Sequence, residues 1–283
     1  MPQTASNTLI ELGSKLLKDI CASPRIEAEI LLAKASKINR IDFYKQVFHI
    51  DRKQEKIFNQ SIELRATGMP MAYILGKKDF WSLTLHIDKN VLIPRPESEH
   101  LVERALKALP EKSFNYKILE LGTGSGAIAI SLAKERPNSS ITATDISKKA
   151  LSLAQHNALE NNVYNIDFIT SDWYQELKKM KFNSIVVNPP YIDQNNKSTY
   201  DESILKYEPE IALFANNKGR ESIYSIIKES PYFLEPDGSL IMEHGFDQSK
   251  YCQGLMEEFG LVNIISTKDY NGHVRITEGF LKA

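Results

Sequence analysis

The chain has 283 residues, 42% of them hydrophobic and 25% charged, and a formal net charge of −1, which is typical of a globular protein with one large domain and a small one. The lack of a basic excess argues against stable nucleic-acid binding, and no apolar run reaches the about 18 residues of a membrane span, so we expect neither partner. Two distant cysteines without metal-ligand or redox spacing, Cys21 and Cys252, indicate reduced thiols, no metal site and a cytoplasmic protein.

Residues 1–75 are expected to form a small helical domain. A first helix is predicted from apolar residues on one helical face, namely Ile10, Leu12, Leu16 and Leu17. Ser23 and Pro24 are typical of an N-cap and a first helical residue, so a second helix is expected to begin there. A third amphipathic segment is predicted from Ile57, Ile62 and Leu64.

Residues 76–96 are expected to form a hairpin linker, with its turn at residues 88–90. The alternating apolar positions that predict its strands are Phe80, Trp81, Leu83, Leu85, Ile87, Val91 and Ile93. Pro94 and Pro96 then stiffen the chain, and Glu97–Leu109 is expected to be helical.

Residues 97–283 are expected to form an α/β domain, because strands and helices alternate from residue 117 onward, as in a parallel doubly wound sheet. The predicted strands are Lys117–Leu121, Ile141–Asp145, Ile166–Thr170, Ser184–Val187 and Ser239–Glu243. The main predicted helices are Gly126–Glu135 and Ser147–Glu160. A terminal pair, Val262–Lys268 and Val274–Phe280, is expected to form an antiparallel hairpin at the edge of the sheet.

A glycine-rich loop follows the first predicted strand of this domain. It comprises Gly122, Thr123, Gly124, Ser125 and Gly126. Glycine lets a ligand approach the backbone, and the next helix offers free N–H groups at its start, so the loop predicts a nucleotide-like cofactor. With Ala127 the loop also satisfies the dinucleotide pattern G-x-G-x-x-A, which leaves a nicotinamide or flavin enzyme open.

Acidic and aromatic residues near strand ends favour a sulfonium cofactor over a dinucleotide. Asp145 ends the second strand, at the spacing from which a carboxylate reaches ribose hydroxyls. Glu120 is expected to face the cofactor's amino group, where a diphosphate would gain nothing from negative charge. Asp172 and Trp173 are candidates for holding and covering an adenine ring. The alternative is that Glu120 is a solvated strand-end residue and Trp173 a core residue.

The fourth predicted strand ends in the candidate transfer site, Asn188, Pro189, Pro190 and Tyr191. The carboxyl ends of parallel strands line the ligand crevice, so this tetrapeptide is expected to face the cofactor. Two prolines remove two donors, which leaves the Asn188 side chain and a neighbouring carbonyl as acceptors beside a phenol ring. This arrangement suits a planar NH2 group, which two acceptors can hold in line for methyl transfer. The alternative is a turn without chemistry.

Residues 120–126 and 188–191 together resemble the S-adenosylmethionine-dependent methyltransferases that act on amino nitrogens of DNA, RNA and protein. A more specific resemblance is to the peptide chain release factor glutamine methyltransferases (the PrmC/HemK family). It rests on the segments Ser23–Leu32, Pro70–Gly76, Phe80-Trp81 and Leu92–Glu97, and the similarity as a whole covers nearly the whole chain. The chain departs from the family pattern at Phe214–Gly219, where a glycine-rich turn is common, and at His244.

The resemblance implies a seven-stranded Rossmann-like methyltransferase domain after a helical domain and a hairpin. It implies methyl transfer from S-adenosylmethionine to the glutamine amide of the Gly-Gly-Gln motif of peptide chain release factors. It further implies that Gly122–Gly126, Asp145, Trp173 and Asn188 bind the cofactor, that residues 188–191 hold the glutamine, and that the N-terminal helices help to dock the release factor.

Three other functions remain open from the sequence. A ribosomal-protein glutamine methyltransferase typically has Pro-Arg-Ser-Pro where this chain has Pro94-Arg95-Pro96-Glu97. A DNA or RNA base methyltransferase would present the same planar NH2 group, but the net charge and the lack of a large target-recognition domain argue against it. A non-catalytic cofactor-binding module is disfavoured by the intact Asn-Pro-Pro-Tyr segment.

Overall fold

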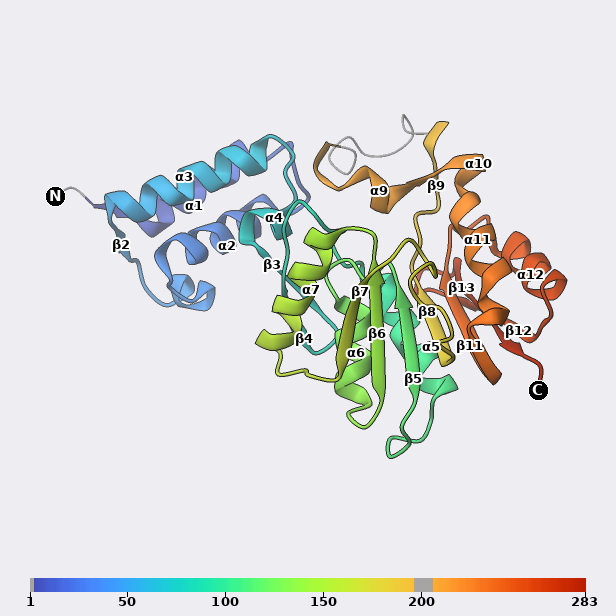
Figure 1. Cartoon of the computed structure of the whole chain (residues 1–283). Helices are drawn as coiled ribbons and strands as arrows, with labels where there is room; N and C mark the ends of the chain where they lie inside the picture. The colour runs from blue at the N-terminus through green and yellow to red at the C-terminus, as the bar shows by residue number, and fades with distance from the viewer. Residues whose placement is uncertain (1–2, 196–205) are drawn as a thin grey trace. The chain divides into compact units, whose positions relative to one another are not determined.

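The computed structural model describes residues 3–195 and 206–283. The chain divides into two compact units, Met1–Lys77 and Lys78–Ala283, and each has its own helices and core (Figure 1). In the described part of the chain, no helix combines the length and apolar character needed to cross a membrane.

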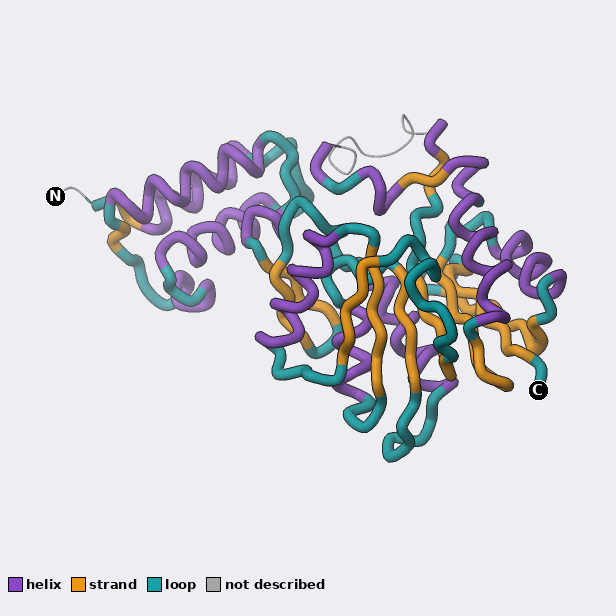
Figure 2. Tube along the Cα trace, viewed as in Figure 1, coloured by secondary structure: helices purple, strands orange, loops and turns teal. Residues whose placement is uncertain are grey.

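The N-terminal unit is built mainly from helices (Figure 2). Its elements are β1 (Thr4–Ala5), α1 (Ser6–Leu16), α2 (Pro24–Ser36), a 3₁₀ helix (Arg40–Tyr44), β2 (His49–Ile50), α3 (Arg52–Ala66) and α4 (Met71–Leu75). The predicted start of α2 is confirmed, since Ser23 is its N-cap position and Pro24 its first residue, although the Ser23 side chain makes no capping hydrogen bond. Helix α3 begins with a capping box between Asp51 and Gln54.

The apolar face predicted for α1 is partly wrong. Leu12 and Leu16 are 52% and 64% exposed, while Leu9 and Ile10 are buried. The reason is Gly13, because a Cβ at this position would lie 2.8 Å from the Phe58 ring of α3. The two helices therefore pack closest at Gly13, and the residues on that side of α1 enter the core. On α3, Ile62 is buried as predicted, but Ile57 and Leu64 are exposed.

The hairpin is confirmed, but its turn lies earlier than predicted. Strands β3 (Lys77–Phe80) and β4 (Leu83–His86) pair with each other, so the chain reverses at Trp81 rather than at residues 88–90. Trp81 adopts a left-handed conformation with φ 55°. Its backbone N–H donates to Glu99 Oε1 at 2.8 Å and its indole N–H to Glu135 Oε1 at 3.1 Å, which holds the reversal in place. These partners are distant in sequence, so the local pattern could not reveal them.

The C-terminal unit is an α/β domain around one seven-stranded sheet (Figure 1). Its first elements after the hairpin are a 3₁₀ helix (Pro96–Ser98), α5 (Glu99–Ala108), β5 (Lys117–Leu121), α6 (Ala127–Glu135), β6 (Ser140–Asp145), α7 (Lys148–Glu160), β7 (Ile166–Thr170), β8 (Phe182–Val187) and β9 (Ile192–Asp193). Beyond residue 205 follow α9 (Glu210–Leu213), β10 (Phe214–Ala215), α10 (Asn216–Gly219), α11 (Glu221–Glu229), a 3₁₀ helix (Ser230–Tyr232), β11 (Leu234–Glu243), α12 (Ser249–Glu258), β12 (Leu261–Lys268) and β13 (Val274–Leu281).

The strand order is β12-β13-β11-β8-β5-β6-β7, which confirms the predicted Rossmann-like sheet with an antiparallel pair at one edge. All seven predicted strands are present. Strand β11 begins earlier than predicted, at Leu234, which pairs with Phe182 before a register shift that ends at Ser239. The turn-like residues Pro236 and Gly238 lie inside that shift and hide the first half of the strand from a sequence pattern.

Alternating residues of the central strands build the two faces of the sheet. On one face, Leu119, Ile185 and Leu240 belong to a buried cluster with residues of α11 and α12. Helices α5 and α6 contact the strands as well, and Glu120 points toward α6, since its carboxylate accepts from the Ala129 N–H. The chain leaves β5 toward β6 and later returns to β8 on the other side, so the topological switch point lies between β5 and β8.

Candidate active site

The register of four neighbouring strands brings the candidate residues together. Thr144, Leu121, Val187 and Met242 lie side by side across β6, β5, β8 and β11. The next residue on each strand is therefore at the same edge of the sheet: Asp145, Gly122, Asn188 and Glu243. This edge contains the switch point, where open α/β sheets bind ligands.

The glycine loop borders a cavity of about 320 Å³, which we call the glycine-loop cavity. The residues predicted for cofactor binding that line it are Gly122, Gly124, Asp145, Asp172, Trp173 and Asn188. Gly124 has φ 55°, and a Cβ there would meet no atom within 4 Å, so the bare backbone faces open space. A cofactor could approach the loop closely at this position.

Asp145 is held rigidly beside the loop. Its Oδ2 accepts from the Gly124 N–H at 2.9 Å and its Oδ1 from the Ser147 N–H at 2.8 Å. Burial raises the pKa of Asp145, while these two N–H donors favour its ionised form. Each oxygen keeps a further lone pair for a hydroxyl donor, which fits the predicted contact with a ribose.

Trp173 and Asp172 lie on the same cavity wall. Trp173 has φ 47°, and its ring comes within 3.8 Å of where a Gly122 Cβ would lie. Its side chain is partly buried against the core. Trp173 can therefore line the cavity and also pack as the core residue that the sequence left open. Asp172 accepts from the Gln175 side chain at 3.3 Å, and it lines the cavity as well.

Glu120 is not a solvated strand-end residue. It is 2% exposed and accepts from the Thr123 hydroxyl and, at 2.9 Å, from the Ala129 N–H. Burial raises its pKa to about 8. Its side chain lines a small cavity of about 60 Å³, the glutamate cavity, together with Ser98, Thr123, Ser125 and Asn188. Gly126 instead serves as the N-cap position of α6.

A third cavity of about 260 Å³, the tyrosine cavity, is also bordered by Asn188. Residues of the predicted transfer site line it, namely Asn188, Pro189 and Tyr191, whereas Pro190 lines the glycine-loop cavity. Its charged lining residues are Arg95, Glu243, Asp247 and Arg275. Asn188 borders all three cavities, as does the apolar residue Leu92.

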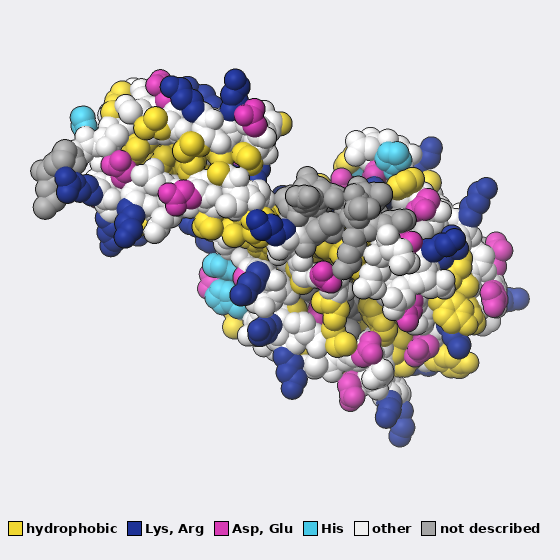
Figure 3. Space-filling view, turned by 90° about the horizontal axis from the view of Figure 1, so that it is seen from above, with side chains coloured by type: hydrophobic (Ala, Val, Ile, Leu, Met, Phe, Trp, Pro, Cys, Tyr) yellow, Lys and Arg dark blue, Asp and Glu magenta, His cyan; other side chains and the backbone are white. Residues whose placement is uncertain are grey.

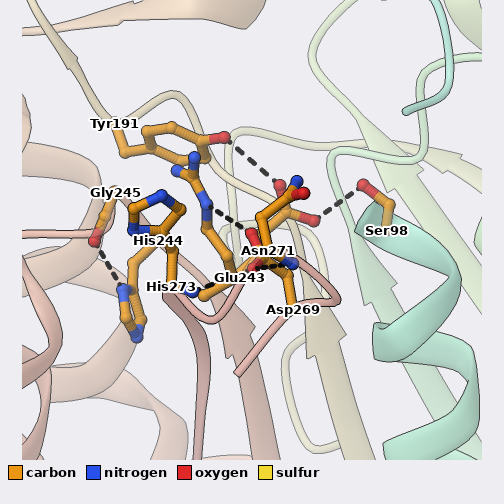
Figure 4. A network of polar contacts seen from close by, with 9 residues as sticks. Ser98, Tyr191, Glu243, His244, Gly245, Asp269, Asn271 and His273 are labelled. Carbon is orange, nitrogen blue, oxygen red and sulfur yellow. Dashed lines mark hydrogen bonds and ion pairs between the residues drawn. The ribbon is translucent and has the colours of Figure 1, made fainter. Parts of the chain in front are cut away.

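A chain of hydrogen bonds anchors Asn188 and Tyr191 on one buried carboxylate. Figure 4 shows its links from Ser98 and from Tyr191 to Glu243. Asn188 Nδ2 donates to Ser98 Oγ at 3.0 Å, and Ser98 Oγ donates to Glu243 Oε2 at 2.7 Å. The Tyr191 hydroxyl donates to Glu243 Oε1 at 3.2 Å. Burial raises the pKa of both Glu243 and Tyr191.

Gln248 supports the backbone after the transfer site. Its Nε2 donates to the Tyr191 carbonyl at 3.1 Å and its Oε1 accepts from the Gly245 N–H at 2.8 Å. The segment Phe214–Gly219, which departs from the family pattern, lies against the same backbone. Its strand β10 pairs with β9, and a Cβ at Gly219 would lie 2.0 Å from the Tyr191 carbonyl oxygen.

Three residues beside the candidate site were not predicted from the sequence, namely Ser98, Glu243 and Gln248. Glu243 carried the best available signal, because it ends a buried strand like Asp145 and Asn188 do. His244, where the chain departs from the family pattern, is buried. Its two ring nitrogens contact the Gly245 carbonyl and the Thr277 hydroxyl, each at 2.8 Å.

Comparisons with known proteins identify both units. The family models described as "PrmC N-terminal domain" and "Methyltransferase small domain" match residues 8–76 and 100–207. The release factor glutamine methyltransferase of Coxiella burnetii is 40% identical over 264 residues, which is 93% of this chain and 94% of the relative. That of Buchnera aphidicola subsp. Acyrthosiphon pisum is 41% identical over 258 residues, or 91% of this chain and 92% of the relative.

Solved structures are similar in fold. A methyltransferase from Pyrococcus furiosus has a TM-score of 0.53 at 20% identity, covering 72% of this chain and 91% of that one. A 16S rRNA methyltransferase of T. thermophilus, in complex with AdoMet and guanosine, has a TM-score of 0.55 at 18% identity, covering 73% and 50%. These likenesses concern the fold alone, whereas the curated relatives match at much higher identity along nearly their whole length. The chain therefore belongs to the family of release factor glutamine methyltransferases.

Proposed function

We propose that this protein transfers a methyl group from S-adenosylmethionine to the side-chain amide nitrogen of the glutamine in the Gly-Gly-Gln motif of peptide chain release factors. The observation that carries the proposal is the position of Asn188, which borders both the glycine-loop cavity and the tyrosine cavity. A transfer between two molecules needs such a meeting point, with one molecule in each cavity. The names of the relatives agree with this acceptor.

The glycine-loop cavity is the proposed cofactor site. S-adenosylmethionine, when bound, supplies a methyl group on a positively charged sulfur. Gly122 to Gly126 would lie against it, with Asp145 holding a ribose hydroxyl and Trp173 beside the adenine. Glu120 is proposed to face the amino group across the glutamate cavity, where a buried carboxylate gains from a nearby cation.

The tyrosine cavity is the proposed site for the glutamine amide. An amide nitrogen is a weak nucleophile because its lone pair is delocalised, so alignment supplies much of the rate. The Asn188 Oδ1 atom and a neighbouring carbonyl are acceptors that can hold the two amide hydrogens, and the Tyr191 ring forms a wall. Acceptors also stabilise the positive charge that grows on nitrogen during transfer.

The N-terminal unit is proposed to dock the release factor. It exposes several large apolar side chains, among them Leu12, Leu16 and Ile20. Figure 3 shows hydrophobic side chains gathered on the visible face of this unit. Exposed apolar groups of this kind are more typical of an interaction surface than of a solvated one.

Transfer of a tritiated methyl group to purified release factor tests the function. We expect one methyl group per release factor at the Gly-Gly-Gln glutamine and none on a version with that Gln replaced by Ala. Equal labelling of both versions would exclude this glutamine. Labelling of a ribosomal protein, or of bare DNA or RNA, with the release factor inert, would reassign the acceptor.

A further inference from the structure

The orientation of the Asn188 side-chain amide follows from hydrogen counting. Ser98 has one hydroxyl hydrogen and Glu243, when ionised, has none, so the 2.7 Å contact between them requires Ser98 to donate. Ser98 can then only accept from Asn188, so the NH2 end of Asn188 must face Ser98 at 3.0 Å. With the amide turned over, Asn188 Oδ1 would face Ser98 Oγ, and neither atom could donate a hydrogen to the other. The Oδ1 end of Asn188 is therefore the end left for other partners.

The surroundings of this chain of hydrogen bonds support a single orientation of the Asn188 amide. Ser98 and Glu243 are 4% and 2% exposed, so water does not compete freely for their bonds. The hydroxyls of Ser98 and Tyr191 and the positive charge of Arg275 favour the ionised form of Glu243, against the effects of burial and of the negative charge of Glu97. Ser98 and Glu243 come from different parts of the fold, the 3₁₀ helix before α5 and the end of β11.

We propose that Ser98 and Glu243 are positioning residues that fix which end of the Asn188 side-chain amide faces the acceptor site. They turn Asn188 Oδ1 toward the substrate NH2 group, and Glu243 holds the Tyr191 ring through its second oxygen. The inference rests on the proposed function, because only an NH2 substrate needs an acceptor there. With Asn188 turned over, two NH2 groups would face each other, and the substrate nitrogen would lose its alignment.

The test compares Ser98→Ala, Ser98→Thr and a control, Ser230→Ala, in the full chain. Ser230 is also a buried serine, but it donates to the Ile227 carbonyl at 2.9 Å, outside this network. We expect Ser98→Ala to lower kcat for release factor methylation by about 10- to 100-fold, as expected for lost alignment. The affinity for S-adenosylmethionine and the KM for release factor should change little. Ser98→Thr keeps the hydroxyl and should keep most of the turnover, as should Ser230→Ala.

A double-variant cycle with Glu243→Gln provides a second measurement. Gln can present an NH2 group to Ser98 and so removes the requirement that Ser98 donate. If both residues act through one chain of hydrogen bonds, the double variant Ser98→Ala with Glu243→Gln should lose no more kcat than the worse of the two single variants. The inference would be overturned by an unchanged kcat in Ser98→Ala or by an equal loss of kcat in Ser98→Thr. Additive losses of kcat in the double variant, or a loss of affinity for S-adenosylmethionine that matches the loss of kcat, would overturn it as well. A wild-type protein inactive on release factor would instead overturn the proposed function.

Discussion

At the scale of single residues, the crevice is distinguished by three carboxyl groups with raised pKa values. Burial is the main cause for Glu120, Asp145 and Glu243 alike. They nevertheless have different partners. Backbone N–H groups hold Asp145, hydroxyls hold Glu243, and Glu120 has one partner of each kind.

The pKa of Glu120 predicts proton release when the cofactor binds. With a pKa of about 8, against an ordinary value of 4.5, Glu120 holds its proton near neutral pH in the free protein. A cation in the glutamate cavity would favour the ionised form, so binding should lower this pKa and release up to about one proton. Calorimetric titration in two buffers of different ionisation enthalpy measures the number of protons released.

Glu120→Gln is the matched control, because it keeps the shape of the side chain and cannot titrate. This variant should release fewer protons than the wild type and bind the cofactor more weakly. Identical proton release in both proteins would show that Glu120 does not respond to the cofactor, and its proposed contact with the amino group would have to be abandoned.

At the scale of elements, the transfer segment is supported by segments far from it in sequence. Strand β10 pairs with β9 directly after Tyr191, and Gln248 at the start of α12 donates to the Tyr191 carbonyl. Gly219 allows this packing because it has no Cβ and adopts φ 74°. The segment Phe214–Gly219 thus has a structural role despite its departure from the family pattern.

Gly219→Ala should therefore cost stability and turnover together. The left-handed backbone alone costs an alanine about 1–2 kcal/mol. A Cβ would also lie 2.0 Å from the Tyr191 carbonyl oxygen, so the backbone beside the transfer segment must move. Chemical denaturation measures the loss of stability, and methylation of the release factor measures the loss of turnover.

Gly272→Ala is the control for backbone strain. Gly272 has φ 83° in the turn between β12 and β13, but a Cβ there would meet no atom within 4 Å. This variant should lose only the strain energy and keep its turnover. Equal losses in the two variants would mean that contact with the Tyr191 backbone does not matter.

At the scale of the whole molecule, we expect the C-terminal unit to bind the cofactor and the N-terminal unit to dock the release factor. Among the residues that the structure describes, those that line the cavities at the sheet edge all belong to Lys78–Ala283, which has its own core. A protein that begins at Lys78 should bind S-adenosylmethionine with an affinity close to that of the full chain. It should methylate intact release factor poorly, since the proposed docking unit is gone.

Calorimetry and methylation assays on this shortened protein measure the two effects. Circular dichroism and a thermal unfolding transition must first show that it is folded. Full activity on release factor would mean that the N-terminal unit does not dock the substrate, whereas lost cofactor affinity in a folded protein would mean that the unit contributes to the cofactor site.

The sequence by itself determined the order of strands and helices and the residues at the strand ends. The glycine loop, Asp145 and Asn188 were predicted as site residues because each lies at or directly after the end of a buried strand, and parallel strands have their carboxyl ends at one edge of the sheet. This reasoning uses only local patterns and a general rule of topology. It also suffices for the family, whose motifs are local in the chain and match the relatives.

The tertiary structure alone decided which side chains complete the site and which faces are buried. Ser98 and Glu243 are 145 residues apart, and their bond depends on how α5 and β11 pack, which no local pattern records. The turn at Trp81 likewise depends on its hydrogen bond to Glu99. The buried face of α1 depends on the packing of Gly13 against Phe58. Hydrogen bonds and close packing between distant segments arise only when the chain is folded, so their partners cannot be found from spacing in the sequence.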